Sequence, residues 1–315
     1  MAYEENYMRI PEILPPRDDG VFKTILTHPD AEPVLRDILE SILGSPVTDI
    51  VVRNVETPVS DINEKRERFD VNCKIGGDRQ AEIEMQADPM KGDSAGTRHE
   101  NIRSRSVFNL CSLHASQPGR GVRYGSLMRS FQIIFCNYTV FPERDGYTSR
   151  FSFRAEDGGE LSDAVNIIFI ELTKLTGLLK KPADEMSPGD MWPIFFKYAD
   201  NPKYRKLIDE LASKKEEINM AARLLASISK DEKERAHYLS RKMFRMDLEH
   251  SMAVSRDEGR AEGFRDGEAI GRRDGKVEGK IEVAKNLLLA GLAPADIVRA
   301  TGLPAAEIEK LIPGA

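Results

Sequence analysis

The sequence has few of the features that mark secreted, membrane or zinc-binding proteins. It contains only three cysteines, Cys73, Cys111 and Cys136, and an odd, widely spaced set does not form a disulfide framework. No CxxC or Cys/His spacing typical of a zinc site is present. No apolar run approaches the ~20 residues that span a membrane. We therefore expect buried, reduced thiols in a cytoplasmic protein without a membrane partner.

Several enzyme motifs are also missing. There is no GxSxG nucleophile turn and no GxxxxGK[ST] phosphate loop. No HNH-like pattern surrounds His99 or His114, so we expect both histidines to be structural or solvated. The formal net charge of −6 argues against a generally basic nucleic-acid-binding surface, although it permits a local basic groove. The acidic, polar N-terminus is not typical of a secretory signal.

The composition is that of a globular protein, with 40% hydrophobic and 31% charged residues. We expect four segments: an arm over 1–17, a globular domain with a helical C-terminal part over 18–250, a glycine-repeat segment over 251–282, and a small helix-turn-helix-like unit over 283–315. Within the globular domain, the patterns predict helices over 31–43 and 98–117 and a helical pattern from 201 to about 250. They predict strands over 49–56, 66–75, 80–86, 130–141 and within 151–172.

Glycine recurs at every fourth position from Gly259 to Gly279. Each interior helical glycine costs about 1 kcal/mol relative to alanine, so a helix here needs a reason, such as close backbone packing against another helix. A flexible polar linker is the alternative. The short terminal helix over 305–311 is too acidic to favour a DNA major groove. A protein-interaction or dimerisation role suits the terminal unit at least as well, and we expect a homo-oligomer formed through the C-terminal helices.

Two runs on either side of Gly76-Gly77-Asp78 alternate apolar and polar residues. They are RERFDVNCKI over 66–75 and QAEIEMQ over 80–86, and both have the pattern of half-buried strands. A three-residue loop centred on Gly77 keeps the apolar residues of both strands on one face. This register places Asp70 opposite Glu84.

Like charges that face each other across a sheet destabilise it. A divalent cation between Asp70 and Glu84 would remove this cost, and two carboxylates with water or phosphate oxygens suit Mg²⁺. The alternative is an ordinary surface hairpin with incidental acids. Glu82 shares the polar face of its strand with Glu84, where it is either a partner of the metal site or a solvent-facing carboxylate.

Several motifs occur in a characteristic order: DDGVFK over 18–23, RFDV over 68–71, EIEMQ over 82–86, an arginine-rich helix, IIFCNY over 133–138 and NIIFIELTK over 166–174. Together they resemble the recombination-promoting nuclease and transposase-like family of the PD-(D/E)XK nuclease superfamily. The resemblance implies an α/β fold, a restriction-endonuclease-like core of a mixed sheet flanked by helices, here with a helical C-terminal extension.

The resemblance also implies roles for particular residues. Asp70 and Glu84 would bind the metal, and Glu40 matches an additional acidic position near it. Gln86 stands where the superfamily usually has lysine. Glutamine can hold a water by hydrogen bonds but is neither a cation nor a base. The implied cofactor is Mg²⁺, with Mn²⁺ or Ca²⁺ as substitutes in vitro.

Basic residues follow the hairpin in the sequence. Arginines at 98, 103, 105, 120, 123 and 129 occur with a single acid, Glu100, and arginine suits phosphate recognition. We expect Arg98, Arg103 and Arg105 to bind nucleic acid together with Lys23, whereas solvated helix charges are the alternative. Phe22 is expected to fill the core.

These observations support two functional hypotheses. The first is a Mg²⁺-dependent DNA endonuclease that acts in recombination or transposase-like DNA processing, with Asp70, Glu84 and Gln86 as catalytic residues. The second is a catalytically weak module on a nuclease fold that binds DNA or protein. Gln86 and the acidic net charge motivate the second hypothesis.

Overall fold

The structure is a computed structural model that describes residues 12–53, 71–87, 95–117 and 122–312, with only the backbone described for 95–99. The chain divides into two compact units, residues 1–246 and residues 247–315. No helix within the described ranges combines the length and the apolar character needed to cross a membrane.

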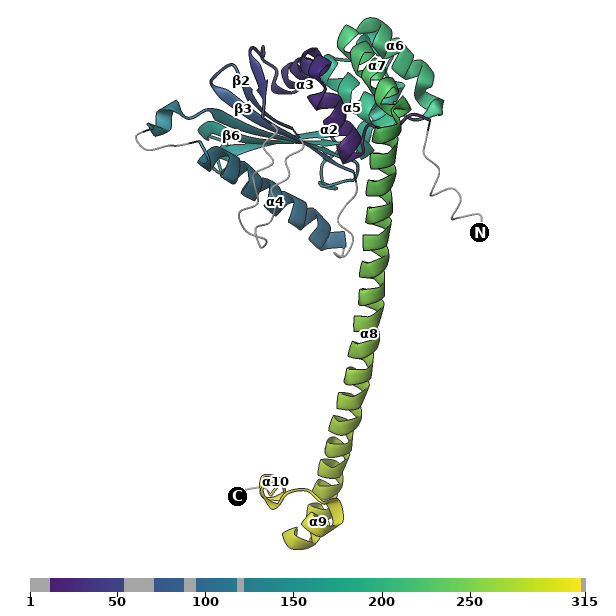
Figure 1. Cartoon of the computed structure of the whole chain (residues 1–315). Helices are drawn as coiled ribbons and strands as arrows, with labels where there is room; N and C mark the ends of the chain where they lie inside the picture. The colour runs from purple at the N-terminus through teal and green to yellow at the C-terminus, as the bar shows by residue number, and fades with distance from the viewer. Residues whose placement is uncertain (1–11, 54–70, 88–94, 118–121, 313–315) are drawn as a thin grey trace. The chain divides into compact units, whose positions relative to one another are not determined.

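A mixed sheet organises the first unit (Figure 1). Its strands are β1 (Ile50–Val52), β2 (Val71–Ile75), β3 (Arg79–Gln86), β4 (Arg129–Cys136), β5 (Thr148–Arg154) and β6 (Glu160–Glu171). Their order is β1-β2-β3-β4-β6-β5. The β3, β4 and β6 strands run parallel, and the other neighbouring pairs are antiparallel. A mixed sheet flanked by helices is the fold class predicted from the sequence.

The larger core lies on one face of the sheet, beneath amphipathic helices. These are α2 (Asp19–Thr27), α3 (Glu32–Leu43), α5 (Pro188–Tyr198), α6 (Arg205–Lys214) and α7 (Glu216–Lys230). Phe22 of α2 packs against Phe135 and Phe196, with ring centroids 5.7 and 4.9 Å away. The predicted core position of Phe22 is therefore confirmed. Asp18 begins α2, because its carboxylate accepts a hydrogen bond from the Val21 amide at 3.3 Å.

Helix α4 (Ala95–Ala115) covers the opposite face of the sheet (Figure 1). Its Ile102 and Leu110 pack with Ile134 and Phe169 in a second apolar cluster. This cover corrects one expectation from the sequence. Strand β2 is half-buried as predicted, but β3 is buried on both faces along most of its length, because it is flanked by β2 and β4 and lies between two helical layers.

The glycine-repeat segment belongs to a helix. Helix α8 (Glu232–Leu289) continues through all six glycines from Gly259 to Gly279. It is followed by α9 (Pro294–Thr301) and α10 (Ala305–Glu309). Ala284, Ile297, Leu303 and Ile308 form a small buried cluster that joins the end of α8 to these two helices.

The cysteines do not all follow the prediction. All three are free thiols; Cys73 and Cys136 are buried in strands, whereas Cys111 is exposed. Cys111 lies on α4, where a helix with one covered face leaves the remaining positions open to solvent. Its expected burial was therefore wrong.

Candidate active site

The β2–β3 hairpin has the register predicted from the sequence. Val71 lies opposite Ile83, and Ile75 lies opposite Arg79. The intervening loop occupies residues 76–78, with φ angles of 58° at Gly76 and 79° at Gly77, a conformation that glycine adopts without steric cost. Asp70 directly precedes β2 in the sequence and lies outside the described residues.

The polar side chains of β3 face α4. In the parallel register with β4, Glu82 is paired with Gln132, and Glu84 with Ile134. Both acids are buried: Glu82 is fully buried and Glu84 is 6% exposed. The alternative of a solvent-facing Glu82 is therefore wrong, because α4 closes this face of the sheet. The alternation of apolar and polar residues in β3 does not show that a helix packs on the polar face of the strand.

Glu84 receives hydrogen bonds from two neighbouring residues on this face. Its Oε1 accepts a hydrogen bond from Arg105 Nη2 of α4 at 3.0 Å and another from the Gln86 amide. Its Oε2 is buried and has no hydrogen-bond partner among the described residues. Burial raises the pKa of Glu84 above its ordinary value, and the Arg105 guanidinium opposes that rise.

Glu84 therefore offers one uncommitted carboxylate oxygen of the kind that Mg²⁺ and similar hard cations bind. No group of three His, Cys, Asp or Glu side chains suited to a metal gathers within the described ranges. A complete ligand set would need Asp70, water or substrate oxygens in addition. The donor chemistry of Glu84 fits a divalent cation on this basis.

Gln86 is the last residue of β3, two positions after Glu84 and on the same face of the strand. Its side-chain amide donates a hydrogen bond to Glu84 Oε1. Its backbone carbonyl accepts a hydrogen bond from the backbone amide of Asn137 at 2.9 Å. In the sheet it is paired with Cys136. The side chains of Gln86 and Glu84 are thus in direct contact.

Glu40 does not lie beside Glu84 in the fold. Its carboxylate accepts the Val47 amide at 2.9 Å, which fixes the chain after α3. The buried residues of α3 belong to the core on one face of the sheet, whereas Arg105 and Glu84 meet on the α4 face. The structure therefore gives Glu40 a local structural contact and separates it from the other predicted ligand.

A family comparison bears on this site. The family model for the PD-(D/E)XK nuclease family transposases matches residues 16–255. The chain belongs to this family. The matched region contains the hairpin, α4 and the whole sheet. Separate searches of curated proteins and of solved structures gave no significant match.

Membership in the PD-(D/E)XK family supports a nuclease-type function with DNA as substrate, and such nucleases usually use divalent metal ions. A buried carboxylate with a raised pKa is unfavourable for stability alone. Glu84, in contact with Arg105 and Gln86, is therefore a candidate functional group.

The predicted nucleic-acid-binding residues have different environments in this PD-(D/E)XK protein. The side chain of Arg98 lies outside the described atoms. Arg103 donates to the Val140 carbonyl at 2.7 Å and stacks over Phe141 at 4.3 Å. Arg105 holds Glu84, as described above. Lys23 is half-buried on α2, and its ammonium makes no hydrogen bond or ion pair within the described residues.

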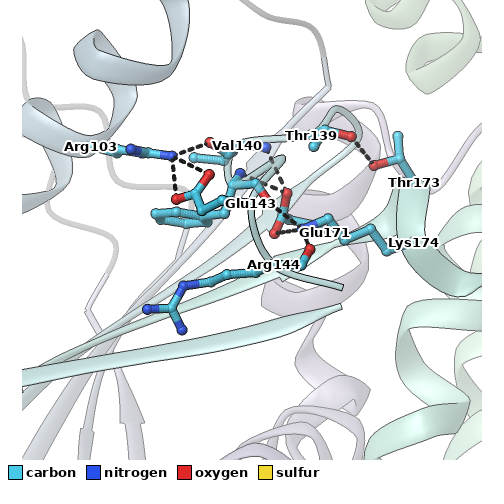
Figure 2. A network of polar contacts seen from close by, with 9 residues as sticks. Arg103, Thr139, Val140, Glu143, Arg144, Glu171, Thr173 and Lys174 are labelled. Atoms are coloured by element: carbon cyan, nitrogen blue, oxygen red, sulfur yellow. Dashed lines mark hydrogen bonds and ion pairs between the residues drawn. The ribbon is translucent and has the colours of Figure 1, made fainter. Parts of the chain in front are cut away.

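Sequence reasoning missed a second buried acid at the end of β6. Glu171 is fully buried and accepts the amides of Val140 and Phe141 at 2.6 and 3.1 Å (Figure 2). Lys174 completes the network by contacting Glu171 at 2.8 Å and two loop carbonyls. This network fixes the loop after β4. An acid followed three residues later by lysine at the end of an apolar strand was its sequence signal.

Lys197 of α5 was also missed. Its ammonium donates to Asn137 Oδ1 at 2.5 Å, and Asn137 follows the residue paired with Gln86. Burial lowers the pKa of Lys197, as does the nearby Arg17, while Asp200 opposes the shift. The fold thus brings a lysine from a distant helix to the strand end where β3 carries glutamine.

Proposed function

We propose that the protein is a divalent-metal-dependent DNA endonuclease, with Mg²⁺ held by Asp70 and Glu84. The observation that carries this proposal is the buried carboxylate of Glu84, whose Oε2 has no hydrogen-bond partner within the described residues although Oε1 has two. A carboxylate placed in this way has an oxygen available for a cation. The confirmed hairpin register supports Asp70 as its partner, because Asp70 is the next residue before Val71.

A bound divalent cation would lower the pKa of water and stabilise charge on a phosphodiester. The residues of the chain have other tasks. Gln86 donates its amide hydrogen to Glu84, which leaves the amide oxygen as an acceptor that can orient a water molecule. Since glutamine carries no charge, it cannot offset the charge of the phosphate as lysine would.

Arg105 supplies positive charge at the same place. Only one of its nitrogens is engaged by Glu84, and Nε has no partner among the described residues. Guanidinium groups bind phosphate through forked hydrogen bonds. We assign Arg105 the role of contacting both Glu84 and a substrate phosphate, with Lys23 and Arg98 as further contacts to the DNA backbone. Arg103 is assigned a structural role, because its contacts are to the loop that follows β4.

The cleavage would serve recombination or transposase-like DNA processing, in keeping with the family to which the chain belongs. Nicking of supercoiled plasmid in Mg²⁺ tests the proposal. We expect nicking by the parent protein, and loss of nicking on chelation and in Asp70→Ala. DNA binding that survives chelation, with no nicking at any concentration of Mg²⁺ or Mn²⁺, would instead favour a binding module on a nuclease fold.

A further inference from the structure

Helix α8 is exposed on all sides over most of its second half. Every residue from 250 to 279 is exposed. A β-carbon added at any of the six glycines from Gly259 to Gly279 would meet no atom of the chain within 4 Å. Packing inside this chain therefore gives no reason for glycine at these positions.

Such a helix is poorly stable on its own. Each interior glycine costs about 1 kcal/mol relative to alanine, and most helical stability in proteins comes from burial of one face. One ion pair at i,i+4 spacing, between Arg272 and Glu268, contributes only about 0.2–0.5 kcal/mol. A partner that buries part of the helix would supply the missing stabilisation.

An apolar and small-residue seam is available for such a partner. At about 100° per residue, one narrow arc of α8 contains Leu248, Met252, Gly259, Gly263, Asp266, Ile270 and Val277. The same arc continues to Ile281 and Ala284, where α9 and α10 already cover it. The four large side chains of this seam are 40–52% exposed. The spacings of four and seven residues resemble those of helices that pack along their length. The other glycines turn gradually away from this arc.

The flank beside the seam has a symmetrical charge pattern. It carries Glu249, Arg256, Arg260, Gly267, Asp274, Glu278 and Lys285. Their spacing reads the same in both directions from Gly267. Each charged residue and its mirror position have opposite signs: 249 with 285, 256 with 278, and 260 with 274. Asp274 also has an exposed contact with Arg273 at 3.0 Å.

We propose that residues 254–280 form an antiparallel helix pair with the same segment of a second copy of this chain, centred near Gly267. In an antiparallel pair, each position of one flank faces its mirror position in the partner. Within 254–280 the pattern therefore gives two kinds of opposite-charge contact, 256 with 278 and 260 with 274, each occurring twice. The inference does not depend on nuclease activity.

The seam favours the same orientation. Antiparallel pairing about this centre sets Gly259 near Val277 and Gly263 near Ile270, so that a small residue meets a large one in each layer. A parallel, in-register pair would set glycine against glycine and isoleucine against isoleucine. Facing layers pack densely when large and small residues alternate across them. The antiparallel arrangement therefore fits both the charges and the side-chain volumes.

Charge reversal with sedimentation equilibrium tests the pairing. We expect the full-length parent to be a dimer, and Arg256→Glu/Arg260→Glu to raise the dimer Kd about tenfold or more. Adding Asp274→Arg/Glu278→Arg should restore the parental Kd, because all mirror pairs become opposite in sign again. Arg265→Glu/Arg272→Glu is the matched control on the opposite side of the helix and should leave Kd unchanged.

Disulfide trapping, with Cys111→Ser as background, distinguishes the orientations. Gly259→Cys/Val277→Cys should form covalent dimers on oxidation, whereas Gly259→Cys alone should not, because its two copies are about 24 Å apart in an antiparallel pair. Rapid linkage of Gly259→Cys alone would show a parallel pair and overturn the proposal. A monomeric parent, or equal effects of the flank and control reversals, would overturn it as well. Circular dichroism identifies any variant that has simply unfolded.

Discussion

The guanidinium of Arg105 lies 3.0 Å from the carboxylate of Glu84, which is 6% exposed. Arg105 belongs to α4, which covers one face of the sheet, and Glu84 belongs to β3. The side chain of Glu84 contacts Arg105 on that face. The contact compensates part of the cost of a buried negative charge while leaving Glu84 Oε2 without a hydrogen-bond partner among the described residues. It defines the place where the proposed chemistry occurs.

Glu84→Gln should abolish cleavage without loss of stability. Burial raises the pKa of Glu84, so ionisation of this group is less favourable in the folded chain than in the unfolded chain. The resulting cost grows as pH rises through the raised pKa and is absent below the unfolded value. The variant removes this cost, and its Tm at neutral pH should equal or exceed that of the parent.

The pH dependence provides the control for this variant. The stability difference between Glu84→Gln and the parent should shrink as the pH falls toward 4, where the parent carboxyl binds its proton in both states. Thermal melts at several pH values measure this difference. A large loss of Tm at neutral pH would show that Glu84 is a structural residue instead.

Arg105→Met should shift the pH dependence of nicking. The guanidinium lowers the pKa of Glu84 against the effect of burial, so its removal allows that pKa to rise further. The acid limb of the pH–rate profile should therefore move to higher pH, and the maximal rate should fall about 10²-fold or more through loss of the phosphate contact. Arg105→Lys should keep the position of the limb more closely. An unchanged profile in Arg105→Met would exclude the proposed coupling.

The hairpin that carries the candidate site could be predicted from local pattern alone. The alternation of β2 and β3 and the Gly76-Gly77 turn fixed the hairpin register, because both are properties of neighbouring residues. The burial of Glu82 and Glu84 was not predictable in this way. It depends on α4, whose covering position is decided by tertiary packing with β4 and β6.

Glu40 and Arg103 illustrate the same limit. Each has the residue type and sequence position expected of a site residue. Their contacts depend on residues distant in sequence or on a following loop: Arg103 reaches the carbonyl of Val140, and Glu40 caps the Val47 amide. Lys197 donates a hydrogen bond to Asn137, which lies 60 positions away in the sequence. No local sequence pattern predicts this contact.

Glu171→Ala should be among the most destabilising single changes in the sheet. It would leave the amides of Val140 and Phe141 and the ammonium of Lys174 without their buried acceptor (Figure 2). Loss of one partner of a buried ion pair costs about 3–5 kcal/mol. Urea unfolding should show this loss, whereas Thr173→Val, at an exposed hydrogen bond of the same region, should change stability by less than about 0.5 kcal/mol.

The thiols should differ sharply in reactivity. Burial raises the pKa of Cys73 to about 12 and raises that of Cys136 as well, where Glu84 and Glu171 add to the effect. Thiolates are the reactive species, so at pH 8 only exposed Cys111 should react with Ellman's reagent in the folded protein. All three should react in denaturant, and Cys111→Ser should show no fast reaction. Rapid labelling of three thiols in the native state would contradict the buried positions of β2 and β4.

The most direct test compares plasmid nicking by the parent, Glu84→Gln and Asp78→Asn in Mg²⁺. Asp78 is an acid in the turn of the same hairpin, where it pairs with Arg129 at 3.2 Å, and it serves as the matched control. We predict metal-dependent nicking by the parent and by Asp78→Asn, and at least a 10²-fold lower rate for folded Glu84→Gln. Nicking by Glu84→Gln at the parental rate would contradict the assignment of the active site.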